Sequence, residues 1–383
     1  MHILRGGRVA DVDGTREADV GIEDGEIVAV GDLGDGDSET DVSGQVVAPG
    51  LIDAHVHVSM DGRPDVSTAV AESDYTAGYR TAANLEAAVE AGVTTVRDLG
   101  ARDTLALDAA ESVADGTLRG PRILAAGQAV IMTGGHGHWT GREADGPHEV
   151  RKAAREQLKR GADVVKCMAT GGVLTEGAVT GAPELTETEL AALVDAAAPT
   201  NTPTAAHAHG EVGIKNATRA GITSIEHGTF MDAEAAELMA EKGTYWVPTA
   251  SALAGIVDHG VEAGIPESAV AKAEDAADRF VEAWEHALDA GVTIAMGTDA
   301  GTPFNFFGNI PEELERMVEY GLSPEDALEA ATVNGAALLG LEDVGKVAEG
   351  YQADLVVLDD DPNADATAWQ EPDAVFTAGD RVA

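Results

Sequence analysis

Six residues whose side chains can bind metal ions recur along the chain, each in a similar setting. They are His55 and His57 in GLIDAHVHV, Lys166 in ADVVKCMATGG, His207 in TAAHAHG, His227 in SIEHGT and Asp299 in IAMGTDAG. Each lies at or near the C-terminal end of an apolar run that resembles a strand. In a (β/α)8 barrel these strand ends converge on one face, so residues far apart in sequence can share one metal centre.

Two pairs of histidines are spaced by one residue. His55 and His57 lie two positions apart on a strand, so both imidazoles leave the same face and can reach one ion. Core packing explains such a pair about as well, but two buried imidazoles without partners are costly, and a metal supplies the partner. Of the second pair, only one member needs to be a ligand. We favour His207 as the ligand and expect His209 to contact the substrate.

Lys166 interrupts an apolar strand in a chain that contains few lysines. Burial disfavours a lone ammonium group and lowers its pKa. One interpretation is a lysine paired with a carboxylate. The other is a neutral amine that takes up CO2, and the resulting carbamate would be able to bridge two metal ions.

Asp299 follows the apolar run TIAMGT, where a carboxylate can bind a metal and exchange a proton with bound water. The alternative is an aspartate that caps the following turn. Histidine, carbamate and aspartate ligands suit zinc or a similar divalent metal. Two metals with a shared ligand would lower the pKa of a trapped water and yield hydroxide. We therefore expect two divalent ions, with zinc as the first choice.

Other polar residues near strand ends are candidates for substrate contacts. His136 in MTGGHGHWTG is flanked by glycines, so we expect it on a mobile, exposed loop. From there it could polarise a substrate carbonyl. For either His136 or His138, a histidine on a surface loop with no catalytic role is an equally good interpretation. Arg97 and Asp98 end the second strand, where we favour a structural ion pair over a substrate role. Arg142 is a weak candidate for holding a substrate carboxylate.

The middle of the chain alternates regularly between eight strand-like runs and Ala/Glu-rich helical stretches, which predicts a (β/α)8 TIM-type barrel over residues 48–344. Residues 1–47 and 345–383 are rich in short strands and turns, so we expect one small β-sandwich domain built from both termini. A loop at residues 174–186 follows the Lys166 strand and is placed to cover the site.

The chain is strongly acidic, with 68 acidic and 24 basic side chains and a net charge of −44. Such a chain repels nucleic acid and anionic lipid surfaces, so neither is expected as a partner. Because the acidity extends along the whole chain, it favours a halophilic protein over an acidic mesophilic one; molar salt shortens the Debye length to ~3 Å and screens the repulsion.

Cysteine content and hydropathy indicate the cellular compartment in which the protein is expected. A single cysteine, Cys167, excludes an intramolecular disulfide. The first 25 residues contain no apolar segment of signal-peptide length. A run of about 18 apolar residues, as a membrane span requires, occurs nowhere. We expect a cytoplasmic protein.

The ordered motifs GLIDAHVHV, the fourth-strand Lys166, AHAHG, IEHGT and GTDAG resemble the amidohydrolase superfamily. TTVRDLG, TGGHG and IEHGT are most similar to its imidazolonepropionase-related branch, which includes bimetal Xaa-Pro dipeptidases with a carboxylated lysine. The C-terminal ALEAATVNGAALLGLEDVGKVAEGYQADLVVLDDDP resembles the usual exit into the small β domain, so the resemblance covers essentially the whole chain. It implies one metal on His55, His57 and Asp299, a second on His207 and His227, and carboxylated Lys166 as the bridge.

One position departs from the pattern of imidazolonepropionases and deaminases. Their chemistry requires an acidic residue three positions after the fifth-strand histidine, where this chain has Gly210, with Glu211 beside it. The departure disfavours imidazolone and deaminase chemistry.

The sequence therefore predicts a binuclear metal-dependent hydrolase. A metal-bridging hydroxide would attack the amide carbonyl of a dipeptide or N-acyl amino acid, and Asp299 would move the proton. The alternatives are hydrolysis of a cyclic amide, lactone or organophosphate ester on the same centre, and a non-catalytic scaffold, which would need none of the ligands. The expected partners are a small-molecule substrate and further copies of the chain in a homo-oligomer.

Overall fold

The computed structural model describes residues 1–66, 68 and 72–383. Strands from both ends of the chain form two small sheets, with strand orders β5-β4-β1-β6 and β19-β18-β17-β7-β2-β3. Their bounds are β1 His2–Arg5, β2 Arg8–Asp11, β3 Gly14–Glu17, β4 Asp19–Glu23, β5 Glu26–Gly31, β6 Ser38–Asp41, β7 Val46–Pro49, β17 Leu355–Leu358, β18 Ala374–Thr377 and β19 Asp380–Arg381.

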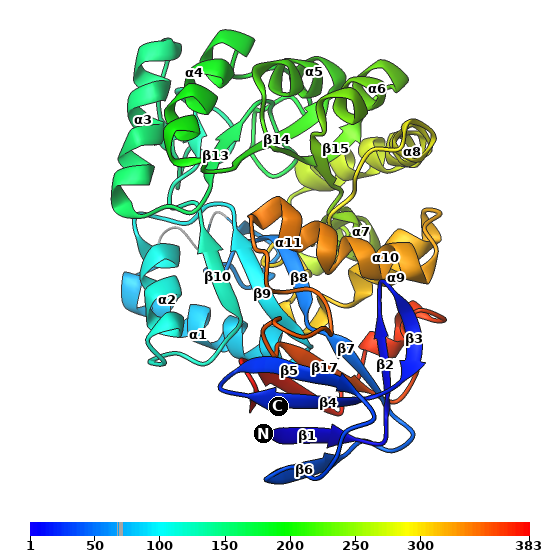
Figure 1. The fold of residues 1–383 in the computed structure, drawn as a ribbon. Coiled ribbons are helices and arrows are strands. Elements are labelled where there is room, and N and C mark those ends of the chain that lie inside the picture. The colour runs from blue at the N-terminus through cyan, green and yellow to red at the C-terminus, as the bar shows by residue number, and fades with distance from the viewer. Residues whose placement is uncertain (67, 69–71) are drawn as a thin grey trace.

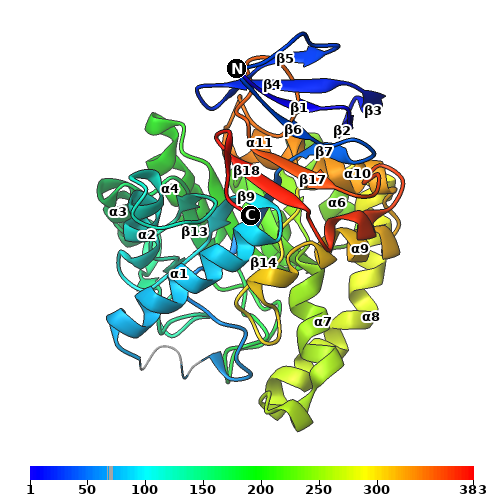
Figure 2. The same ribbon diagram turned by 90° about the horizontal axis from the view of Figure 1, so that it is seen from below.

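The two small sheets share one apolar core. Leu4, Val47 and Phe376 are among the buried residues that pack together there, although they come from opposite ends of the sequence. Both chain ends lie in this region (Figure 1), and β17 and β18 lie beside the N-terminal strands when the molecule is turned (Figure 2). The termini therefore meet as expected, whereas the domain boundaries at residues 47 and 345 stay a prediction.

Parallel strands form the middle of the molecule, in sheets of order β10-β9-β8 and β12-β11-β13-β14-β15-β16. Their residues are mostly buried, as expected for parallel strands covered on both faces. Their bounds are β8 Leu51–Val56, β9 Val93–Asp98, β10 Arg122–Ala125, β11 Val130–Ile131, β12 Arg142–Glu143, β13 Val165–Met168, β14 Thr204–Gly210, β15 Ser224–Phe230 and β16 Tyr245–Val247.

The expected eighth strand, TIAMGTDAG, is not a regular strand. Its backbone nevertheless joins the two parallel sheets: Trp246 N–H donates to Thr293 O at 2.9 Å, and Asp299 N–H donates to His55 O at 2.7 Å. The extended conformation ends at Asp299, whose φ of 60° lies in the left-handed region. The segment pairs with each sheet through one isolated bridge, Ile294 with Trp246 of β16 and Ala300 with Val56 of β8.

Helices lie between and around the parallel strands, with α3 to α6 outside β13–β15 (Figure 1). Gly161, Gly221 and Gly291 end three of them in the left-handed conformation expected of C-terminal glycines. The bounds are α1 Asp74–Glu90, α2 Leu105–Ala114, α3 Gly146–Arg160, α4 Glu187–Ala197, α5 Glu211–Ala220, α6 Ala233–Lys242, α7 Ala250–His259, α8 Glu267–Ala290, α9 Glu312–Glu319, α10 Pro324–Ala330 and α11 Val333–Leu339.

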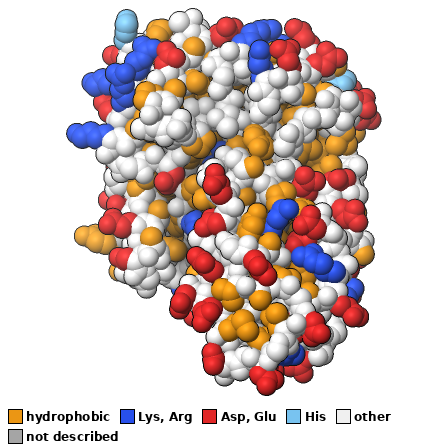
Figure 3. Space-filling view, viewed as in Figure 1, with side chains coloured by type: hydrophobic (Ala, Val, Ile, Leu, Met, Phe, Trp, Pro, Cys, Tyr) orange, Lys and Arg blue, Asp and Glu red, His pale blue; other side chains and the backbone are white. Residues whose placement is uncertain are grey.

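Acidic side chains are spread widely over the face seen in Figure 3, and basic ones gather at the upper left, where α3 lies. Arg151, Lys152, Arg155 and Lys159 line a shallow hollow on that helix. Among the described helices, none combines the length and apolar character that a membrane crossing requires.

Candidate active site

The structure brings the predicted ligands together as two adjacent groups, His55, His57 and Asp299 in one and His207, His209 and His227 in the other. Within each group one ligand atom per residue lies within 4.8 Å of the others. The rings of His55 and His227 have centroids 5.2 Å apart, so the groups are neighbours. The ligands come from β8, β14, β15 and the segment after α8 because the C-terminal ends of parallel strands share one edge.

In the first group, hydrogen bonds orient both imidazoles toward Asp299. Nδ1 of His57 lies 2.8 Å from Gly100 O, and Nδ1 of His55 lies 2.9 Å from Glu226 Oε2. A carbonyl and an ionised carboxylate only accept hydrogen bonds, so both Nδ1 atoms carry the proton. In the neutral rings the Nε2 lone pairs then face Asp299 Oδ1, at 3.2 Å from His57 and 3.4 Å from His55. Although burial opposes it, Asp299 raises the pKa of His57, so without a cation between them the carboxylate favours a proton on His57 Nε2. Two lone pairs and a carboxylate directed at one point suit a bound cation.

In the second group, the tautomer of His227 follows from its neighbour Thr249. The Thr249 hydroxyl donates to Pro248 O at 2.7 Å, so it can only accept from His227 Nδ1, also 2.7 Å away. His227 therefore carries its proton on Nδ1 and has a free lone pair on Nε2. Burial holds the pKa of His227 well below its usual value, which keeps the ring neutral.

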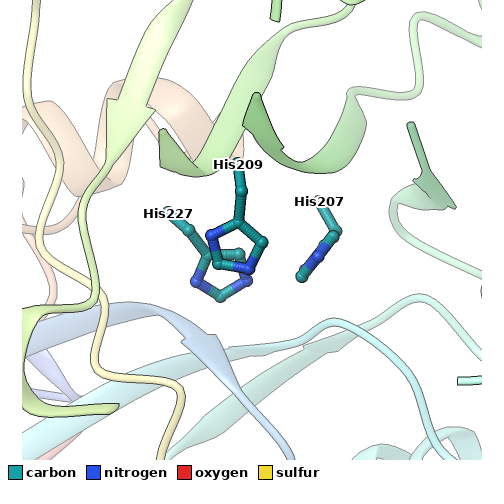
Figure 4. Close-up of side chains that lie close together, drawn as sticks. All are labelled: His207, His209 and His227. Atoms are coloured by element: carbon teal, nitrogen blue, oxygen red, sulfur yellow. The ribbon is translucent and has the colours of Figure 1, made fainter. Parts of the chain in front are cut away.

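The other two imidazoles of this group leave buried nitrogens without partners. Nε2 of His207 and Nε2 of His209 form no hydrogen bond within the described part of the chain. Nδ1 of His209 lies 2.7 Å from Thr229 Oγ1, and burial lowers the pKa of His209 to about 4. The three rings turn toward one another (Figure 4). A metal ion would satisfy these nitrogens.

Lys166 lies on β13 and lines the same cavity as both groups. Its side chain is 1% exposed, and among the described residues it forms no hydrogen bond or ion pair. Burial lowers the pKa of its amine, the condition under which an amine reacts with CO2. The alternative interpretation, a lysine paired with a carboxylate, is therefore not supported, because no described carboxylate contacts the amine directly.

Glu226 is not one of the candidate ligands, but it orients His55 through a hydrogen bond. The sequence does not reveal this role. Oε1 of Glu226 accepts hydrogen bonds from Arg97 Nη2 at 3.1 Å and from Ser224 Oγ at 2.6 Å. Although burial opposes ionisation, Arg97 and His55 bring the pKa of Glu226 down to about 2. The expected Arg97–Asp98 ion pair was wrong, because neighbouring residues of a strand face opposite sides. Asp98 instead accepts two backbone N–H groups.

Two candidate ligands and one of their supports adopt strained backbone conformations. His227, Asp299 and Thr249 have φ angles of 68°, 60° and 56°, in the left-handed region that residues other than glycine rarely enter. Each such residue costs roughly 1–3 kcal/mol and persists where the surrounding structure holds it, commonly at functional sites.

His136 is packed into the site and not on an exposed loop as the sequence suggested. Its Nδ1 lies 2.7 Å from Thr175 Oγ1, and its ring centroid is 4.4 Å from that of His207. A Cβ atom on Gly172 would lie 2.4 Å from the ring, so only glycine leaves room for it. The segment that begins at residue 171 therefore folds over the site, and its Leu174 lines the cavity. His138 is exposed.

The cavity above the candidate ligands has a volume of about 150 Å³. Besides the ligands it is lined by His136, by Arg102 from the loop after β9, and by apolar side chains that include Leu105, Trp139, Val173, Leu253, Ile256 and Phe280. Arg142 does not line it. Nε of Arg142 pairs with Glu156 Oε2 at 2.8 Å, away from the site. Arg102 lies just beyond the end of a strand, and this position could have identified it from the sequence as a residue that lines the site.

Residues 46–382 match the sequence profile described as the amidohydrolase family. The chain belongs to this family. The match spans the strands that carry all the candidate ligands, and relatives and structural neighbours named as hydrolases, such as ochratoxinase and prolidase, agree with it. The protein is therefore an enzyme of the amidohydrolase family with its mixed α/β fold.

Relatives within the family differ in the activities they are named for. The chain is 34% identical over 360 residues to ochratoxinase of Aspergillus niger, an alignment covering 86% of this chain and 73% of the relative. A structure of a Xaa-Pro dipeptidase with bound methionine superposes with a TM-score of 0.93 at 32% identity, covering 99% of both chains. A 5-methylthioadenosine/S-adenosylhomocysteine deaminase of Haloarcula marismortui is 29% identical over 407 residues, covering 93% of this chain and 84% of the relative.

Proposed function

We propose that this protein is a binuclear metal-dependent hydrolase that cleaves the amide bond of a dipeptide or an N-acyl amino acid. The observation that carries the proposal is the pair of adjacent donor groups, with Lys166 in the same cavity. The likeness to a Xaa-Pro dipeptidase and to an ochratoxinase supports amide hydrolysis. We further propose that β8 to β16 and the segment at residues 293–300 close into a (β/α)8 barrel.

The donor sets suggest how two metals would be held. His55, His57 and Asp299 would bind the first ion and His207 and His227 the second, with carboxylated Lys166 as the shared ligand. Neutral imidazole and carboxylate ligands fit zinc. His209 would remain on the second side as a substrate contact.

Bound divalent metals would supply Lewis acidity and lower the pKa of a water held beside them. Asp299 would take the proton of the attacking water and pass it to the leaving nitrogen. Although burial opposes ionisation, His55 and His57 lower the pKa of Asp299, so the carboxylate is in the basic form that this step requires.

We propose that His136 donates a hydrogen bond to the substrate carbonyl. In the proposed arrangement the Thr175 hydroxyl accepts the backbone N–H of Gly137 at 3.2 Å and donates its own proton to His136 Nδ1, 2.7 Å away. That arrangement leaves the ring proton of His136 on Nε2, where it can donate to the developing oxyanion.

The geometry around Gly210 disfavours deaminase chemistry. A Cβ atom at this position would lie 2.1 Å from Gly181 O, so the loop after β13 leaves no room for any side chain. The acidic residue that deaminases require three positions after the fifth-strand histidine therefore has no place here.

A substrate panel tests the proposal. Protein purified with added zinc is incubated with dipeptides, N-acyl amino acids, cyclic amides, lactones and organophosphate esters, and the products are measured by mass spectrometry. We expect hydrolysis of the first two classes, its loss on chelation and its return with zinc. Turnover of lactones or phosphate esters alone, or amide hydrolysis that survives complete metal removal, would refute the proposal.

A further inference from the structure

The cavity differs in charge from the chain around it. The chain carries 68 acidic residues, yet among the lining residues that the structure describes the one carboxylate is Asp299, a candidate metal ligand. Apart from Lys166, the cationic side chain of the lining is Arg102. Arg102 is therefore the side chain of this lining that offers a permanent positive charge to a negatively charged group on the substrate.

The backbone places Arg102 close to the first donor group. Two residues earlier, Gly100 O accepts the hydrogen bond from His57 Nδ1 at 2.8 Å. The intervening Ala101 N–H donates to Gly127 O at 2.9 Å, which anchors the loop after β9. Arg102 therefore starts from a rigid position beside the ligands.

Contacts within the protein also orient the guanidinium group. Nη1 of Arg102 donates to Glu72 O at 3.1 Å, and Nη2 lies 2.8 Å from Asp74 Oδ1. The Asp74 side chain is 83% exposed, so water screens this pair and it neutralises the cation weakly. A guanidinium carries five N–H donors in a planar fork, which lets it keep such partners and still bind a carboxylate.

The remaining wall of the cavity is apolar. Trp139, Leu253, Ile256 and Phe280 line it together with Val173 from the covering loop. This surface favours an apolar group on the substrate, since burial of apolar area is favourable by about 25 cal/mol per Å².

We propose that Arg102 binds the free carboxylate of the substrate and thereby selects amides that carry a carboxylate on one side of the scissile bond and a large apolar group on the other. This rests on the proposed amide hydrolysis and adds a specificity-determining residue to it. Arg102 takes the role that the sequence gave to Arg142.

Paired substrates test the role of Arg102. An apolar dipeptide and its C-terminal carboxamide differ only in the negative charge. For Arg102→Gln we expect KM for the acid to rise ~10–100-fold, the range for one charged hydrogen bond, with kcat changed less than about threefold. The carboxamide should be hydrolysed equally by wild type and variant. Arg142→Gln is the matched control and should behave as wild type, while metal content and thermal midpoints verify both folds.

Binding measurements separate this inference from the proposed hydrolysis. Calorimetry compares an apolar N-benzyl amino acid, which has an amine in place of the scissile amide, with its carboxamide and requires no turnover. A preference of wild type for the acid that Arg102→Gln abolishes supports the inference even if no dipeptide is cleaved. The inference is overturned if wild type shows no preference in turnover or in binding, or if Arg102→Gln affects acid and carboxamide equally.

Discussion

Oε2 of Glu226 lies 2.9 Å from Nδ1 of His55, and the next residue along the chain, His227, belongs to the other donor group. In a regular strand, adjacent side chains face opposite sides. The left-handed φ of His227 interrupts this alternation, so the two consecutive residues Glu226 and His227 contact different donor groups. The two halves of the proposed centre therefore depend on each other for their geometry.

Replacing Glu226 by glutamine is expected to weaken metal binding. A glutamine oxygen directed at His55 turns its NH2 group toward Arg97, and the opposite orientation loses the acceptor for His55, so one contact is lost either way. Loss of such a support typically costs ~10–100-fold in metal affinity. Titration of the apoprotein against a zinc-binding dye measures the change. Ser224→Ala, which keeps the carboxylate, is the control, and equal affinities for Glu226→Gln and wild type would contradict the interpretation.

Lys166→Ala should abolish turnover, because the proposed bridging ligand is lost. Metal content should fall below the two ions per chain expected for wild type, and short carboxylic acids should restore part of both. Growth with 13C-labelled bicarbonate should give a carbamate carbon signal by NMR in wild type. Lys152→Ala, at a side chain that is 70% exposed, is the control. A Lys166→Ala variant with two metals and normal turnover would rule out the bridge.

Asp299→Asn should retain much of the metal and lose most of the turnover. The amide oxygen can still bind an ion, but the amide cannot take up a proton, and a general acid–base group is worth ~10²–10⁴-fold in rate. Steady-state rates and metal analysis on the same sample test both statements. If kcat falls less than about tenfold, another residue moves the proton.

The variants His207→Asn and His209→Asn distinguish the ligand of β14 from its neighbour. Both Nε2 atoms are buried and lack a hydrogen-bond partner among the residues that the structure describes, so geometry alone allows either as the ligand. We expect His207→Asn to lose one of two bound metals and His209→Asn to keep both while changing KM. Metal stoichiometry by mass spectrometry decides the matter, and the reverse pattern would exchange the two roles.

Stability should rise with salt, because the net charge of −44 makes the chain repel itself and ions screen the repulsion. Thermal midpoints at constant metal from roughly 0.1 M to 3 M KCl test this expectation. Screening alone saturates by about 1 M, so a further increase would indicate ion binding or preferential exclusion. A flat or falling midpoint would argue against a halophilic protein and leave the metal site unaffected.

Local patterns predicted the ligand-bearing strands well. The apolar runs before His55, Lys166, His207 and His227 form β8, β13, β14 and β15, because strand character depends on neighbouring residues. What could not be predicted depends on contacts between distant segments. The packing of His136 requires a loop more than thirty residues further along the chain, and the role of Glu226 appears only when its side chain meets His55, which lies far away in sequence.

The eighth strand shows a different limit. Its composition is typical of a strand, yet Asp299 adopts a φ of 60° in the left-handed region, and its N–H donates to His55 O, on a strand far away in sequence. The left-handed conformation of Asp299 could not be predicted from the sequence pattern. It directs the carboxylate toward His55 and His57.

Residue Gly50 alone separates β7 from β8, the strand that carries His55, and β7 pairs with β17 from the far end of the chain. During synthesis β8 therefore emerges long before the strand that anchors its neighbour. Contacts of such large sequence separation slow folding and leave apolar strands exposed in intermediates. We expect metal loading to follow completion of the β7–β17 pair, so that a strand made after all the ligands, which contributes none itself, controls when the site forms.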